Sequence, residues 1–393
     1  MISATRLTLA PGLTCKFNCK LPLSLNLIGE ITCTIVSTAA ETDFLDLEDM
    51  NLTRTVLIPV ILIMDQGSVF IFLNGPKDRL EFSMDGVYGR TFSKFDGFHS
   101  LPIDAGVHFI SYRINSGSEG AFVTFIFYPV NPKVFVFDWC EQDELYKLKH
   151  SSDEIIADKL LEYPGLISYD RFMSHEAESQ ISWNRFTKFI TMESVYYVFR
   201  ESKITDELYE VTPMMESHHS LLTELENKGD VCPMMKFIEI PSLKEYGKLI
   251  NADSNLLTQC AMDKSPIFEY LNFNFSDLFA QLQLSFLLLS FAQNFEGFEQ
   301  WFSIVGLLLE SFEVASKNIS EYEQFFEVIQ EHFEMCPDDF FTGLMNENKL
   351  YKLLNGFFAN TSGNFEEFKG FYETKFGWQF AEDESFEDAP VIV

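Results

Sequence analysis

The fold is decided by the stretch Ser276–Trp301, SDLFAQLQLSFLLLSFAQNFEGFEQW. It predicts two successive helices, the first of them apolar on almost every side. A helix without a polar face has to be enclosed by other elements, so we place it at the centre of an all-α domain. Ser276 is expected to be its N-cap, with Asp277 adding a negative charge at the positive end of the helix dipole.

The apolar run within this stretch is too short for a membrane span. It extends from Leu284 to Ala292, about nine residues, whereas a helix needs about twenty to cross the hydrocarbon core. Glutamine and asparagine side chains bracket it. We therefore expect a core helix and no association with a membrane.

The residues that follow also carry helical periods. Apolar residues recur at spacings of three and four from Phe298 to Phe312 and predict one broad buried face. Ser320 and Glu323 match a capping box, so a helix is expected to begin at Glu321 and to bury Phe325, Phe326, Ile329 and Phe333. Short connections between such helices predict antiparallel neighbours in an α-helical stack.

The earlier part of the chain, from Gly67 to Asp138, is typical of strands. Val69–Leu73 is continuously apolar, as in a strand covered on both faces, and the segment from Leu80 to Met84 alternates as on a half-buried one. Turn residues separate these segments, so strands at 107–112, 121–127 and 134–138 are expected to return antiparallel.

The fold class is therefore predicted to be α+β, with an N-terminal antiparallel β-rich domain, a C-terminal all-α helical stack and an extended C-terminal tail. We expect an extension over residues 1–65, the β-rich domain over 66–150, and a helical and irregular connector over 151–262. The all-α domain should cover 263–380 and the tail 381–393. Three interpretations of the extension compete: a lineage-specific segment, a disordered tail, or sequence from a wrongly assigned start codon or an unremoved intron. The last two are favoured jointly because little in it supports packing.

Composition excludes one class of partner. The chain has 28 basic and 59 acidic residues, a net charge of −31, and 15% aromatic residues. Affinity for a polyanion comes from clustered lysine and arginine, so no direct binding of nucleic acid is expected. The aromatic content predicts well-packed domains with the acidity on their surface.

No metal or cofactor site is expected. The seven cysteines are scattered, as is typical of a reducing compartment. Cys15, Cys19 and Cys33 could supply three zinc ligands, but no fourth ligand lies nearby, so free thiols are the preferred interpretation. His218 and His219 are adjacent without a carboxylate–histidine spacing, which favours a surface loop over a metal site.

The sequence does not indicate an enzyme. It contains no nucleophile-elbow, phosphate-loop, dinucleotide-binding or zinc-protease motif. His108 is the best single candidate for a catalytic base, yet it lies in the middle of a predicted strand with no nucleophile paired to it in sequence. A structural, hydrogen-bonded histidine is the preferred interpretation, and no catalytic residue is assigned.

The C-terminal tail supports a binding function. Acidic residues precede the short segment Ala389, Pro390, Val391, Ile392 and Val393. Such a segment is suited to add as a strand to the sheet of another protein, where main-chain hydrogen bonds provide affinity. The alternative is a frayed terminus, and the two interpretations carry equal weight at this point.

Several blocks also resemble the A1 cistron-splicing factor family, in the order and spacing of that family. The resemblance covers about residues 66 to 393. The blocks are Phe95-x-Gly97, Leu101-Pro102, Gly106–Phe109, Trp183-x-x-Phe186-Thr187-x-Phe189-Ile190, Phe237-x-Glu239-x-Pro241, Asp277-Leu278-x-x-x-Leu282-Gln283-x-x-Phe286, Phe298-Glu299-x-Trp301, Pro337-x-Asp339-Phe340-Phe341, Lys375-Phe376-x-Trp378-x-Phe380 and Ala389-Pro390-Val391.

The resemblance implies a non-enzymatic assembly factor of the U5 spliceosomal particle. Members of this family bind the large U5 scaffold protein through its RNase H-like and MPN-like domains and keep the U5 helicase from joining early. The expectations that follow are a monomer before assembly, a location in cytoplasm and nucleus, and a role in pre-mRNA splicing. A general protein-interaction adaptor with a helical peptide-binding domain, unrelated to splicing, is the alternative.

Overall fold

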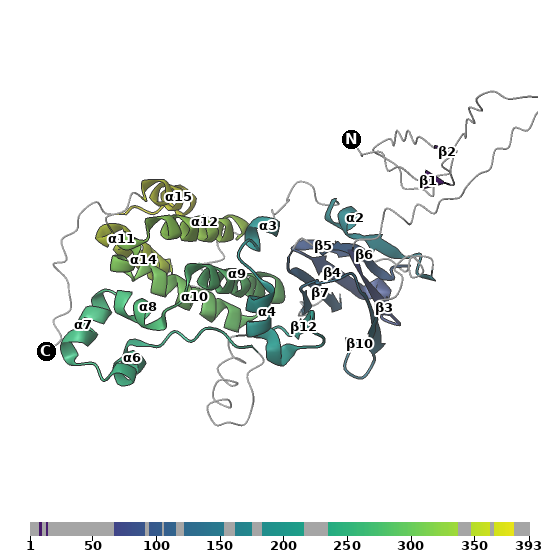
Figure 1. Cartoon of the computed structure of the whole chain (residues 1–393), viewed down its shortest axis with the longest axis horizontal. Coiled ribbons are helices and arrows are strands. Elements are labelled where there is room, and N and C mark those ends of the chain that lie inside the picture. The colour runs from purple at the N-terminus through teal and green to yellow at the C-terminus, as the bar shows by residue number, and fades with distance from the viewer. Residues whose placement is uncertain are drawn as a thin grey trace, which may run out of the picture. The chain divides into compact units, whose positions relative to one another are not determined.

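The computed structural model describes residues 8–9, 13–14, 67–90, 94–103, 106–114, 122–152, 162–174, 183–215, 235–336, 347–361 and 365–380 (Figure 1). The chain divides into two compact units, Met1–Asp65 and Gln66–Val393. In the first unit the described residues are two short antiparallel strands, β1 (Thr8–Leu9) and β2 (Leu13–Thr14). The rest of the predicted extension lies outside the described residues, so its interpretation stays a prediction.

Two five-stranded sheets open the second unit. The first has the strand order β10-β9-β3-β6-β11, and the second has the order β12-β8-β7-β4-β5. Their bounds are β3 (Gly67–Leu73), β4 (Leu80–Met84), β5 (Val87–Arg90), β6 (Gly97–Pro102), β7 (His108–Ile114), β8 (Val123–Phe127), β9 (Val134–Cys140), β10 (Leu145–Ser152), β11 (Leu166–Ser168) and β12 (Leu208–Val211), with a 3-10 turn, η2 (Lys77–Arg79), before β4.

Aromatic rings fill the space between the two sheets. Phe72 on β3 lies 4.9 Å from Phe82 on β4, measured between ring centroids. Phe125 on β8 and Phe137 on β9 are 4.7 Å apart in the same way. Face-to-face packing of two sheets through alternate inward side chains is the arrangement of a β-sandwich. The high phenylalanine content of the chain therefore reflects in part the core of this sandwich.

The pairing of β9 differs from the sequence-based expectation of an antiparallel return. β9 pairs antiparallel with β10 but parallel with β3, with Val69 opposite Val134. β11 likewise pairs parallel with β6. Four of the five described strands between β3 and β9 lie in the second sheet. β9 then re-enters the first sheet from the end at which β3 began, and local turn residues carry no information about such a crossover. The burial of β3 on both faces is as expected.

Helices make up most of the remainder of this unit (Figure 1). Their bounds are α2 (Tyr169–Met173), α3 (Trp183–Phe186), α4 (Met192–Phe199), α6 (Leu243–Ile250), α7 (Ser254–Met262), α8 (Ser265–Leu271), α9 (Phe275–Ala292), α10 (Phe295–Leu309), α11 (Phe312–Lys317), α12 (Ile319–Met335), α14 (Glu347–Asn360) and α15 (Glu366–Phe376), with a 3-10 turn, η4 (Arg200–Ser202), after α4. β-strands followed by a helical stack confirm the predicted fold class.

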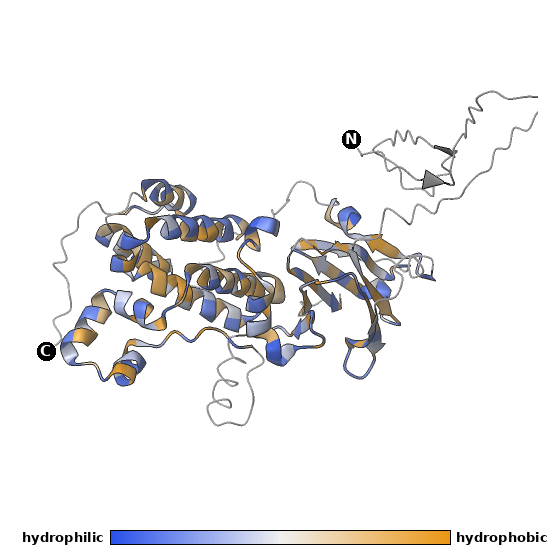
Figure 2. Ribbon diagram, in the orientation of Figure 1, coloured by the Kyte–Doolittle hydropathy of each residue, from blue (hydrophilic) through white to orange (hydrophobic). Residues whose placement is uncertain are grey.

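Helix α9 lies inside this stack with most of its residues buried. The ribbons of the stack carry many hydrophobic residues (Figure 2). By length and composition α9 could cross a membrane, but 72% of the 18-residue window is buried inside the protein. The next helix, α10, packs closely on it: a Cβ on Gly297 would stand 2.7 Å from both Leu288 Cβ and Ser285 O. Only glycine permits this approach, which explains why the first turn of α10 contains one.

Two helix starts differ from their predictions. The N-cap of α9 is Asn274 instead of Ser276; its Oδ1 accepts from Asp277 N at 2.7 Å, and the earlier start lets Phe275 pack on Phe268. The capping box predicted at Ser320 does not form, because α12 begins at Ile319 directly after α11 and Ser320 Oγ donates to Glu321 Oε2 instead. The four apolar residues predicted to be buried on α12 are buried.

The outer face of the second sheet packs against the helices. Val107, Phe109 and Ile126 belong to the same buried cluster as α9 and α10. The indole Nε1 of Trp183 donates to Val107 O at 2.8 Å, which ties α3 to the start of β7. Gln283 on α9 accepts from Phe189 N and donates to Arg185 O. The domain boundaries drawn from the sequence stay a prediction; within Gln66–Val393 one buried cluster includes both strand and helix residues.

A buried indole–imidazole pair joins α10 to α12. Trp301 Nε1 donates to His332 Nδ1 at 3.1 Å, and the imidazole stacks on Phe286 of α9 with ring centroids 3.9 Å apart. Both side chains are fully buried. Burial lowers the pKa of His332 to about 3, so the ring is neutral at pH 7. Because Nδ1 accepts from the indole, the single ring proton is on Nε2.

We expect Trp301→Ala to lower the free energy of unfolding by about 3–5 kcal/mol, the usual cost of truncating a large buried aromatic. Trp301→Phe keeps most of the packing and removes only the N–H donor, so its cost should be about 1–3 kcal/mol. Urea unfolding of the three proteins measures both values. A loss below about 1 kcal/mol for the alanine variant would contradict the buried position.

The burial of His332 also predicts an acid-labile fold. Its pKa lies lower in the folded than in the unfolded chain, so between these two values the unfolded chain binds one more proton and stability falls as the pH falls. From pH 7 to pH 5 this single group should remove about 2 kcal/mol. His332→Asn keeps an acceptor for the indole and should be less sensitive to pH by that amount in urea unfolding at both pH values. The exposed control His150→Asn should retain the sensitivity of the natural chain, and equal sensitivity in all three would contradict the argument.

Candidate functional site

His108, the candidate base from the sequence, is completely buried, and it is the first residue of β7 instead of lying in the middle of the strand. Its Nδ1 lies 2.7 Å from Asp85 Oδ2 and its Nε2 lies 2.9 Å from Pro102 O. A carbonyl oxygen and a carboxylate can only accept hydrogen bonds. Nε2 therefore donates to Pro102 O, and Nδ1 and the Asp85 carboxyl form a buried hydrogen bond.

Asp85 is held by two further donors. Its Oδ1 accepts from Phe109 N at 2.8 Å, and its Oδ2 accepts from Tyr169 OH at 2.8 Å. Burial, with the Asp85 charge beside it, raises the pKa of the Tyr169 phenol well above its ordinary value. The network joins the β4–β5 turn, β6, β7 and α2, and the imidazole has no contact with solvent. This geometry supports the structural interpretation of His108 over the catalytic one.

The described residues show no group of three or more histidine, cysteine, aspartate or glutamate side chains that could hold a metal ion. Cys140, Cys260 and Cys336 are free thiols, and burial raises the pKa of Cys336 to about 12. Cys15, Cys19 and Cys33, like the adjacent histidines His218 and His219, lie outside the described residues. Their assignments from the sequence stay predictions.

Aromatic packing and a hydrogen bond hold the chain in place at the point where the predicted tail begins. Trp378 stacks on Phe376 with ring centroids 4.5 Å apart, and Tyr351 OH donates to Gln379 O at 2.8 Å. Phe380, only 6% exposed, stacks on Tyr351 and meets Phe358 edge-on. We call these six residues the C-terminal anchor. Together α14 and the end of α15 hold the main chain up to Phe380.

Ala389, Pro390, Val391, Ile392 and Val393, the residues predicted to bind a partner, lie outside the described residues. Their binding role therefore stays a prediction. What the structure adds is the anchor, which sequence reasoning did not assign. The block Lys375-Phe376-x-Trp378-x-Phe380 was the available signal, because aromatic residues just after a helix end are suited to fold back onto its neighbours.

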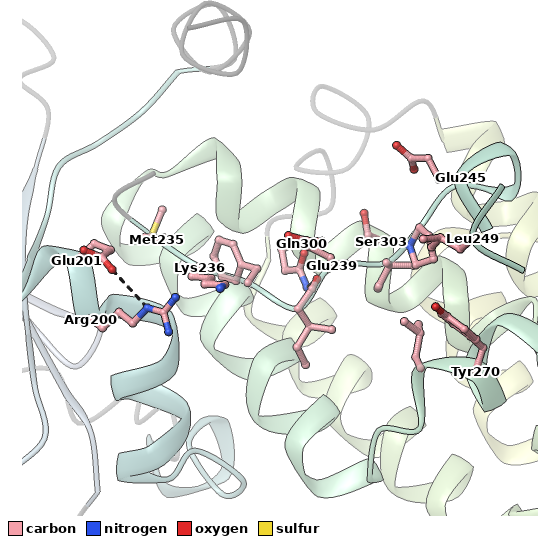
Figure 3. Close-up of a pocket in the computed structure, with 15 residues that line it drawn as sticks. Arg200, Glu201, Met235, Lys236, Glu239, Glu245, Leu249, Tyr270, Gln300 and Ser303 are labelled. Carbon is pink, nitrogen blue, oxygen red and sulfur yellow. Dashed lines mark hydrogen bonds and ion pairs between the residues drawn. The ribbon is translucent and has the colours of Figure 1, made fainter. Parts of the chain in front are cut away.

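A second candidate surface lies on the helical stack. It is a groove of about 940 Å³ between the segment Met235–Pro241, one side of α6, the end of α8 and one side of α10 (Figure 3). Arg200 and Glu201, joined by an ion pair of 3.4 Å between Nε and Oε1, close one end. Sequence reasoning described this region as an irregular connector, although it contains the block Phe237-x-Glu239-x-Pro241.

Two family models match the chain over most of its length. The AAR2 N-terminal domain matches residues 66–199, and the AAR2 C-terminal repeat region matches residues 237–381. Both sheets, apart from β12, fall in the first match, and the helices from α6 to α15 fall in the second. The C-terminal anchor and most of the groove also lie within the second match.

The matches with curated relatives extend over nearly the whole length of those relatives. The chain is 24% identical over 347 residues to Protein AAR2 homolog of Caenorhabditis elegans, covering 80% of this chain and 95% of that protein. It is 24% identical over 369 residues to Protein AAR2 homolog of Homo sapiens, covering 84% and 94%. With both halves matched in order, the chain belongs to the AAR2 family, the A1 cistron-splicing factors that its motifs resemble.

Proposed function

We propose that this protein is a non-enzymatic assembly factor of the U5 spliceosomal particle. It binds the large U5 scaffold protein at its RNase H-like and MPN-like domains and blocks premature association of the helicase during splicing-factor biogenesis. Membership of the AAR2 family supports a splicing-related function. The observation that carries the proposal is the C-terminal anchor, which holds the start of an acidic, β-branched tail against α14.

The anchor fixes the point at which the tail leaves the folded part, and this favours binding of the tail by a partner. A tethered segment searches a limited volume around its attachment point, so its effective concentration near a partner already held by the folded part is high. The last residues then add to an exposed sheet edge of the scaffold through main-chain hydrogen bonds. In this scheme the folded part provides the first contact, and the tail prolongs the complex.

The charge of the chain suits a partner that will later hold RNA. A net charge of −31 attracts basic surfaces over several ångströms and raises the association rate. The same charge repels RNA from the surface that it covers. Occupation of the scaffold, without chemistry, is then sufficient to delay the next partner. The protein acts as a monomer in cytoplasm and nucleus and makes no direct contact with RNA.

The groove favours a second candidate function, a general peptide-binding adaptor unrelated to splicing. A groove lined by helices and an extended segment is a common way to hold a peptide. Affinity purification from nuclear and cytoplasmic extracts separates the two. Recovery of U5 components supports the assembly factor, whereas other partners without any U5 component support the adaptor.

The tail test uses a chain that lacks Ser385–Val393. We expect its melting temperature to stay within about 1 °C of that of the intact chain, because the described core ends at Phe380. Its affinity for the isolated scaffold domains should fall about tenfold or more, since the added strand and its main-chain hydrogen bonds are lost. Calorimetric measurements at two salt concentrations give the loss of affinity for the scaffold domains. They also give the electrostatic contribution to the binding that the truncated chain retains.

Phe380→Ala is the matched variant, because it loosens the anchor and keeps the whole tail. It should weaken scaffold binding by less than the deletion does, and mainly through faster dissociation. Equal affinities of the intact and truncated chains would contradict the role of the tail and leave the folded part as the whole binding surface.

A further inference from the structure

The segment Met235–Pro241 crosses α10 without forming a helix, a strand or a turn (Figure 3). Two hydrogen bonds attach it to the helical stack. Lys236 N donates to Val198 O at 2.8 Å, and Ile238 O accepts from Gln300 Nε2 at 3.0 Å. In an extended chain the main-chain groups of alternate residues point to the same side. The groups of residues 236 and 238 therefore face the protein.

The main-chain groups of Phe237 and Glu239 therefore point to the opposite side, away from the helical stack. No described residue forms a hydrogen bond with the main-chain N–H or C=O of Phe237 or Glu239. These groups are arranged as on the edge of a sheet, with one side paired and the other without a partner among the described residues. An open main-chain edge within a groove is a template for one more extended chain.

Side chains around this edge supply apolar contact area. Leu249 on α6 and Tyr270 on α8 are 59% and 49% exposed and line the groove. Phe237 and Ile240 are half-buried beside them. Large apolar side chains left in solvent around one groove indicate a binding surface, because each would otherwise be expected to be covered. The groove therefore offers pockets for apolar side chains next to a main-chain edge.

Charge decides which kind of peptide fits. The groove is lined by Glu201, Glu239 and Glu245 against Arg200 and Lys236, and Arg200 is already paired with Glu201. Glu239 is exposed and makes no ion pair with any described residue. The whole chain carries a charge of −31. A segment with positive charges is attracted to this surface, whereas the acidic residues of the chain's own tail are repelled from it.

We propose that the groove binds an extended, basic segment of another protein, in which apolar side chains alternate with lysine or arginine. The segment pairs its main chain with Phe237 and Glu239, places apolar side chains against Leu249 and Tyr270, and brings a cation to Glu239. This site is separate from the C-terminal tail, and its existence does not depend on the proposed function.

The test uses the full chain and an octapeptide of alternating lysine and valine, blocked at both ends and labelled for fluorescence anisotropy. Two further versions carry N-methyl groups on either the odd or the even residues. An extended peptide pairs along only one of its edges, so one methylated version should bind like the parent and the other at least tenfold more weakly. Equal binding of both methylated versions and the parent would overturn the proposal.

Matched charge reversals localise the site. Glu239→Lys should weaken binding of the parent peptide about tenfold. Glu323 is an exposed residue of α12 outside the groove. Glu323→Lys makes the same change in net charge and should alter the affinity for the parent peptide less than twofold near physiological salt. Equal losses in the two variants would reduce the binding to non-specific attraction and overturn the proposal.

A chain ending at Phe380 tests the competing occupant. Its affinity for the peptide should equal that of the full chain. An increase of tenfold or more would assign the groove to the chain's own tail and overturn the proposal. These measurements contain no scaffold protein, so their failure leaves the proposed U5 function intact, and equal scaffold affinities with and without the tail would leave the groove proposal intact.

Discussion

The enclosure of α9 is the constraint on which the rest of this structure depends. A helix of 18 residues with apolar side chains all round is stable in water only when neighbours cover each side. Here α10, α12, α4 and the outer face of the second sheet supply that cover. Strands β7 and β8 of the β-sandwich therefore help to bury a helix that lies more than a hundred residues further along the chain.

Polar groups inside this core determine how the neighbours are oriented. Gln283 bonds to main-chain groups around α3, and the Trp301–His332 pair connects α10 to α12. His108 does the same between the two sheets, because it bonds to Asp85 of the second sheet and to Pro102 O at the end of β6 in the first. Apolar burial is not directional, whereas each of these contacts is satisfied in one arrangement only. They give the core its specificity, and their burial explains why histidines that could suggest catalysis have structural roles.

The proposed binding features lie where this core ends. The C-terminal anchor covers the aromatic residues up to Phe380, and the tail begins there. Across the stack, hydrogen bonds to described helices hold Met235–Pro241 along one edge. Both features place extended chain next to a rigid helical surface, which lowers the conformational cost of pairing with another protein. A strongly acidic, well-packed chain with such edges is suited to hold a partner without performing chemistry on it.

Local pattern in the sequence determined the fold class, the enclosure of α9 and the buried face of α12. These depend on side-chain periodicity and short-range hydrogen bonds, which the sequence records directly. Tertiary structure alone decided the parallel pairing of β9 with β3, the hydrogen-bond partners of His108 and the attachment of Met235–Pro241 to α4 and α10. Each of these depends on which distant segment lies alongside, and one sequence without its fold contains no local signal for that neighbour.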